Sequence, residues 1–132
     1  MRSLLIVILV ASFPLLAQDP FELRTERDYQ EHVNKIYQGE IEKRLADNTR
    51  VDILTDDLAI EVDFAHKWYE AVGQACHYSM MTGKRPAILL IVRDSSEERY
   101  VKAAVNVCRN VRVDLDGHEY SITVLIFRDV DE

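Results

Sequence analysis

The fold is decided by residues 50–64, which read RVDILTDDLAIEVDF. Two runs rich in Val, Ile, Leu and Phe, 50–54 and 58–64, flank Asp56 and Asp57. Apolar runs separated by a short polar pair of this kind are typical of two strands joined by a turn. The stretch therefore predicts an antiparallel hairpin.

The acidic side chains of this hairpin are segregated by face. Side chains alternate along a strand, so Glu61 and Asp63 share one side and are separated by about 7 Å. Asp52 lies between apolar Val51 and Ile53 on the other strand, and it can meet Glu61 across the hairpin. Buried like charges are costly unless a cation neutralises them, and carboxylate oxygens suit Mg²⁺ or Mn²⁺. The hairpin thus predicts a divalent metal site.

The flanking chain alternates helices with strands, which indicates an α/β fold. The continuous apolar run over 87–92 predicts a strand buried on both faces. A right-handed crossover should make this strand parallel to the strand over 58–64. The expected elements are a helix from Thr25 (capped with Asp28) to a stop at Gly39, strands 40–45, 50–54 and 58–64, a helix over 66–81, a strand over 87–92, a helix begun by Ser95 with Glu98, and a strand over 120–127.

Chain length and composition are those of one domain. The 132 residues are 48% hydrophobic and 30% charged, which supports a real core and a polar surface. Residues 1–17 have a short basic start, an apolar run and a small residue at the end, which is the layout of a signal peptide. We expect export to the periplasm or medium, no stable membrane insertion after cleavage, and a mature domain over 18–132. An uncleaved anchor is the alternative.

Charge and cysteine content narrow the function classes. The net charge of -7 argues against a broad DNA-binding face, since phosphate affinity comes mainly from Lys and Arg, although a bound cation reverses the local sign. Cys76 and Cys108 form either a disulfide or two buried thiols, and their spacing does not indicate zinc. The one basic concentration is on the third predicted helix: Arg99, Lys102, Arg109 and Arg112.

The order helix, three strands, helix, strand, with acids on the second and third strands, resembles the PD-(D/E)XK nuclease superfamily over residues 25–92. The resemblance implies a restriction-endonuclease-like αβββαβ core, a mixed sheet flanked by helices, here with a further helix and strand. In it Asp52 matches the first acid and Glu61 the second. Glu42 matches an additional acid found in many members.

The resemblance also covers the helix after the hairpin, with one departure. Gln74 and Tyr78 match the Gln-x-x-x-Tyr feature of several exonuclease-like branches. Asp63 stands where the family has its lysine, and Lys67 looks like that lysine moved to the following helix. The resemblance implies that Asp52, Glu61 and the backbone carbonyl of Val62 hold Mg²⁺ or Mn²⁺.

The remaining roles also come from the resemblance. Lys67 would orient the attacking water and neutralise phosphoryl charge, and Gln74 would position the water or a phosphate. Asp63 would add a ligand or pair with Lys67. The expected function is an exported, metal-dependent hydrolase of phosphodiester bonds in nucleic acid, with DNA favoured. Two alternatives stay open: an inactive nuclease-fold domain acting as a binding module, and a protein-binding surface on the third helix.

Overall fold

The computed structural model of the chain describes residues 22–130. The predicted signal peptide at 1–17 and the expected cleavage after Ala17 lie outside the described residues. Within them no helix is long and apolar enough to cross a membrane. The helices and strands are α1 (Glu26–Tyr37), β1 (Glu40–Arg44), β2 (Arg50–Leu54), β3 (Leu58–Phe64), α2 (Trp68–Thr82), β4 (Arg85–Val92), α3 (Glu98–Cys108), β5 (Val113–Leu115), β6 (His118–Tyr120) and β7 (Thr123–Arg128).

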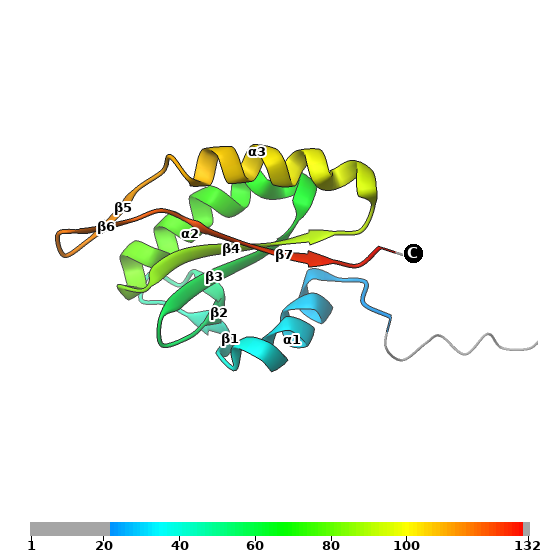
Figure 1. Cartoon of the computed structure of the whole chain (residues 1–132). Helices are drawn as coiled ribbons and strands as arrows, with labels where there is room; N and C mark the ends of the chain where they lie inside the picture. Colours follow the sequence, from blue (N-terminus) through cyan, green and yellow to red (C-terminus); the bar gives the residue numbers. More distant parts are fainter. Residues whose placement is uncertain (1–21, 131–132) are drawn as a thin grey trace, which may run out of the picture.

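Five strands form one mixed sheet in the order β1-β2-β3-β4-β7. β1, β2 and β3 pair antiparallel, whereas β3, β4 and β7 pair parallel. Helices α2 and α3 cover one face of this sheet and α1 covers the other (Figure 1). The prediction of an α/β fold with a mixed sheet flanked by helices is confirmed, and so is the parallel pairing of the strands that α2 connects.

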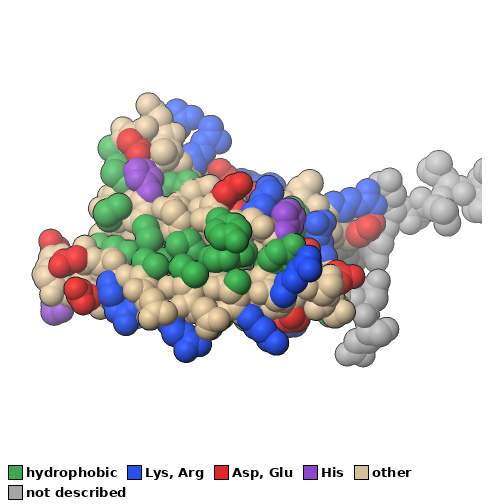
Figure 2. All heavy atoms as spheres, turned by 90° about the horizontal axis from the view of Figure 1, so that it is seen from above, with side chains coloured by type: hydrophobic (Ala, Val, Ile, Leu, Met, Phe, Trp, Pro, Cys, Tyr) green, Lys and Arg blue, Asp and Glu red, His purple; other side chains and the backbone are tan. Residues whose placement is uncertain are grey.

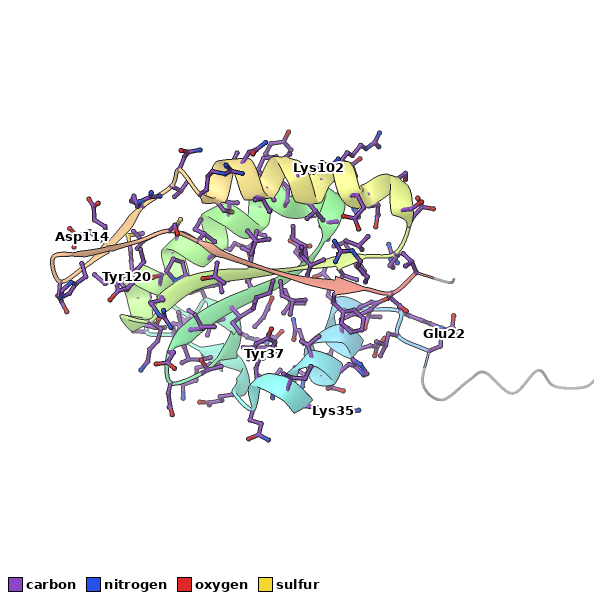
Figure 3. All side chains as sticks on the ribbon, in the orientation of Figure 1. Glu22, Lys35, Tyr37, Lys102, Asp114 and Tyr120 are labelled. Atoms are coloured by element: carbon purple, nitrogen blue, oxygen red, sulfur yellow. The ribbon has the colours of Figure 1, made fainter. Side chains whose placement is uncertain are left out.

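The hydrophobic core has two layers that share β4. This strand is buried along seven of its eight residues, because α2 and α3 pack on one side and α1 on the other. Burial of both faces explains the unbroken apolar run in the sequence. Tyr37 reaches from α1 into the layer beneath the sheet (Figure 3). The side of β4 toward α2 and α3 carries Ile88, Leu90 and Val92, and the side toward α1 carries Ala87, Leu89 and Ile91.

Helix α1 begins as predicted, and α3 does not. The Thr25 hydroxyl accepts from the Asp28 N–H while the Asp28 carboxylate accepts from the Thr25 N–H, which completes a capping box. The predicted box between Ser95 and Glu98 is wrong. Asp94, extended at the end of β4, accepts from the Ser96 N–H at 2.7 Å and starts a 3₁₀ turn before α3. A carboxylate one residue earlier therefore satisfies the Ser96 amide.

The predicted strand over 120–127 is also wrong at its start. Tyr120 belongs to a separate hairpin of β5 and β6, and the sheet strand β7 begins only at Thr123. The turn signal at Asp116 and Gly117 marks the tip of this hairpin, where both residues have positive φ, 55° and 86°. Two left-handed residues are what a tight two-residue hairpin requires. The hairpin extends from the end of the molecule in Figure 1.

The two cysteines are free thiols on neighbouring helices, Cys76 on α2 and Cys108 on α3. Burial, with a smaller contribution from the nearby Cys76, raises the pKa of the Cys108 thiol to about 11. The sequence left open a disulfide or two thiols, and the structure has two free thiols.

Gly39 is required for close packing, and it does not itself end the helix. The left-handed residue that ends α1 is Gln38, with a φ of 53°. A Cβ on Gly39 would lie 2.7 Å from the Leu54 carbonyl oxygen and 2.8 Å from the Ile53 Cγ2. Only a glycine lets β1 start this close to β2.

We expect Gly39→Ala to destabilise the fold by about 1–3 kcal/mol, because the clash is with backbone and overpacking carries costs of this size. The matched control is Gly73→Ala on α2, where a Cβ meets nothing within 4 Å and alanine should add about 0.5–1 kcal/mol. Urea unfolding of both variants measures the difference. Equal stability of the two would contradict this assignment of Gly39.

Candidate functional site

The site begins where β2 and β3 part. These strands pair through Ile53 with Ile60 and Leu54 with Ala59. One step further along, the Val62 N–H donates to the Asp52 Oδ2 at 2.7 Å. A side chain has replaced the next backbone acceptor of the ladder. The structure thus brings Asp52 against β3, on the side where Glu61 lies.

The carboxyl groups of Asp52 and Glu61 interact in a poorly solvated space. Glu61 is 5% exposed, and its Oε2 has no hydrogen-bond partner among the described residues. Burial is the largest cause that raises the pKa of Glu61, followed by the charge of Asp52. Burial also raises the pKa of Asp52, and the Val62 N–H opposes that rise. Two buried acids this close do not both ionise easily without a cation.

Lys67 supplies one positive charge at the edge of this space. Its Nζ lies 2.9 Å from the Glu26 Oε1 and 3.9 Å from the Asp63 Oδ1. The hydrogen bond with Glu26 and the charge of Glu26 raise the pKa of Lys67, so it is an ammonium at neutral pH. Burial raises the pKa of Asp63, and Glu26 adds to that rise. The lysine at the start of the second helix therefore reaches Asp63 of β3.

Glu26 is a site residue that the sequence analysis missed. It lies in the first turn of α1, 41 residues from the lysine it pairs with. Its charge contributes to the raised pKa of Asp52, Glu61 and Asp63 alike. No local spacing connects it with them. The capping signal at Thr25 places the start of the helix, but only packing of α1 under the sheet brings that start to the carboxylates.

Glu42 lies beside Asp52 with an unusual backbone. The pairs Ile41 with Ile53 and Lys43 with Val51 place Glu42 opposite Asp52. Its φ is 52°, a left-handed conformation that costs a non-glycine residue about 1–3 kcal/mol and that gathers at functional sites. The charge of Glu42 helps to raise the pKa of Asp52. The predicted accessory acid is therefore close to the pair.

Two residues of α2 complete the set. Tyr78 is 8% exposed, and burial raises its pKa to about 12, with the charges of Glu61 and Asp52 next in effect. Gln74 is half-buried one turn earlier and has no side-chain hydrogen bond to another described residue. Positions 67, 74 and 78 fall on one helical face by their spacing. Of these, Lys67 lies 3.9 Å from Asp63, and the charges of Glu61 and Asp52 act on Tyr78.

The carboxylate oxygens of this site suit a hard divalent cation that takes only one or two of its ligands from the protein. Within residues 22–130 no group of three or more His, Cys, Asp or Glu side chains is arranged to hold a metal. Magnesium, however, is usually held by one or two carboxylates, with waters and substrate phosphates completing its shell. Asp52 and Glu61 supply two such carboxylates, and the unpartnered Glu61 Oε2 is a free ligand atom.

Comparisons with known proteins give one distant likeness. The chain is 29% identical over 106 residues to a KilA-N domain-containing protein of Acanthamoeba polyphaga mimivirus. The matched part is 80% of this chain and 42% of that protein, so the chain spans less than half the length of this relative. No family model matches the chain, and no solved structure matches it.

The raised pKa values predict that the metal-free protein loses stability as pH rises. Between the ordinary value of 3.8 for Asp63 and its folded value of about 7, the folded state holds more protons than the unfolded state, so the free energy of unfolding falls with pH. Asp52 and Glu61 act in the same direction. We expect a higher melting temperature at the acidic end of this window than above it.

Glu61→Gln is the test variant. It removes the carboxyl group whose ionisation is opposed both by burial and by the charge of Asp52. It should flatten the pH dependence and raise stability at the alkaline end. Urea or thermal unfolding in a chelator, at a series of pH values, measures both. A wild-type stability that rises across this window would contradict the assignment.

Proposed function

We propose that the chain is a metal-dependent nuclease-like domain that hydrolyses phosphodiester bonds of nucleic acid, with DNA as substrate. The proposal includes the restriction-endonuclease-like character of the α1-β1-β2-β3-α2-β4 segment and the export expected from residues 1–17. The observation that carries it is the meeting of Asp52 and Glu61 at the point where β2 and β3 part. Such a pair is expensive in a folded protein unless a cation uses it.

In this proposal Asp52, Glu61 and the Val62 carbonyl hold Mg²⁺ or Mn²⁺. A cation so held would polarise the phosphate and lower the pKa of a bound water. Lys67 does not act as a base, because its pKa is raised. Its ammonium orients the water and neutralises charge that develops on phosphoryl oxygens. The Gln74 side chain makes no hydrogen bond to another described residue. It positions the water or a phosphate.

The choice of DNA has separate support. The relative with 29% identity is named for a KilA-N domain, and KilA-N is a DNA-binding domain. The likeness extends over 80% of this chain and supports DNA as the substrate class, whereas the hydrolytic chemistry rests on the carboxylates.

Asp52→Asn and Glu61→Gln should each lower Mn²⁺-dependent cleavage of duplex DNA by at least a hundredfold, since each removes a charged ligand while keeping its size. Cleavage is followed on a labelled duplex, and Mn²⁺ binding by calorimetry. Glu119→Gln removes an equal charge from the exposed β6 strand and should cleave like the wild type. Undiminished cleavage by both site variants would exclude this centre.

Lys67→Ala should retain Mn²⁺ binding and lose about 10²–10³-fold in cleavage rate, which is the size expected for one lost stabilising donor. Lys67→Arg keeps the charge and should recover part of that loss. A lysine that only pairs with Glu26 would change thermal stability and leave the rate of cleavage unaltered.

The second candidate is a nuclease-fold domain without catalysis that acts as a binding module. Asp63 at the usual lysine position and the net charge of -7 favour it. Calorimetry separates the two candidates: no binding at millimolar Mn²⁺ favours the module, whereas binding with cleavage favours the enzyme.

A further inference from the structure

The β1–β2 hairpin carries two arginines directly opposite one another. Arg44 on β1 pairs with Arg50 on β2 in the antiparallel register, and both residues are exposed. Side chains at directly opposed positions point to the same side of a hairpin, and like charges placed so are destabilising. An anion bound between the two guanidinium groups would offset this repulsion.

None of the described residues supplies that anion. Neither arginine takes part in a salt bridge with another described residue. Of the neighbouring charges, Lys43 pairs with Glu40 at 3.1 Å, Asp47 bonds to His77 at 2.7 Å, and Glu42 has no salt bridge with either arginine. The two guanidinium groups are thus left as a local positive centre on an acidic protein.

The hairpin that presents them is held in place. Its tip is closed by the Leu45 N–H donating to the Thr49 carbonyl at 2.8 Å, and it is tied to α2 through the contact between Asp47 and His77. The Thr49 hydroxyl lies 3.5 Å from the same imidazole. The arginines therefore project from a fixed platform.

This platform adjoins the carboxylate site. Arg50 is two residues from Asp52 on β2, so their Cα atoms are about 7 Å apart. Along this strand Arg50 is exposed at the hairpin end and Asp52 is half-buried at the site.

We propose that Arg44 and Arg50 form a phosphate clamp that holds the nucleic-acid backbone beside the Asp52–Glu61 pair. Guanidinium groups bind phosphate oxygens through two parallel hydrogen bonds. The clamp supplies attraction that the acidic surface lacks and sets one phosphate next to the site. As a substrate-positioning device it rests on the proposed function, but as a phosphate-binding surface it can be measured without catalysis.

The other basic surface, on α3, is a natural comparison. Figure 2 looks onto this face of the molecule and shows Lys and Arg side chains along one long edge, beside a band of hydrophobic ones. Arg128, which lines the same groove as Lys102 and Arg109, is bonded to Glu98 at 2.6 Å. α3 lies against α2 and β7, away from β1 and β2 in the sheet order.

The test is binding of the full chain to a fluorescein-labelled DNA duplex in a chelator, over a series of KCl concentrations. The slope of log affinity against log salt is negative, and each lost phosphate contact reduces its magnitude by about 0.9. Arg44→Ala with Arg50→Ala should therefore reduce this magnitude by about 1.8. Arg44→Lys with Arg50→Lys keeps both charges and should keep the slope. Lys102→Ala with Arg109→Ala removes the same net charge and should leave the slope near that of the wild type.

The clamp is overturned by an unchanged slope in the hairpin variant, by an equal fall in the α3 variant, or by absence of binding in the wild type. Thermal melting confirms that each variant is folded. Cleavage in Mn²⁺ is assayed separately. A clamp that binds DNA without any cleavage would leave this inference standing and remove the hydrolase, whereas cleavage insensitive to Arg44 and Arg50 would do the reverse.

Discussion

The hydrogen bond from the Val62 N–H to the Asp52 carboxylate is the constraint on which the site depends. A buried backbone N–H must find an acceptor, and in a regular antiparallel ladder that acceptor is the carbonyl of the neighbouring strand. Here a side chain takes its place, so β2 and β3 can part without an orphaned donor. The opening that results holds Glu61 among few solvating groups.

The charge balance of the opening follows from that geometry. Lys67 is the one cation paired with the acids of the site among the described residues, and it contacts Glu26 and Asp63 more closely than the Asp52–Glu61 pair. The inner pair must therefore be protonated or meet a cation from outside. Stability of the fold comes from the apolar layers on both faces of β4, which allows the opening between β2 and β3 to carry this cost.

Much of the fold could be predicted because its signals are local. The apolar run over 87–92 indicates a buried strand, and Thr25 with Asp28 marks a helix start. The errors occurred where two local signals competed. Asp94 and Ser95 are both good caps, and only the extended exit from β4 selected the first. Tyr120 suits either of two adjacent strands, and pairing with Val113 assigned it to the small hairpin.

The sequence by itself determined which side chains would share a strand face or a helix face, because alternation and helical spacing act over a few residues. It thereby put Glu61 and Asp63 on one face of their strand and Gln74 in line with Tyr78. Only the tertiary structure decided that Glu26 reaches Lys67 and that Arg44 stands opposite Arg50. Those contacts depend on strand register and on the docking of α1 against the sheet, which are set by packing between distant segments.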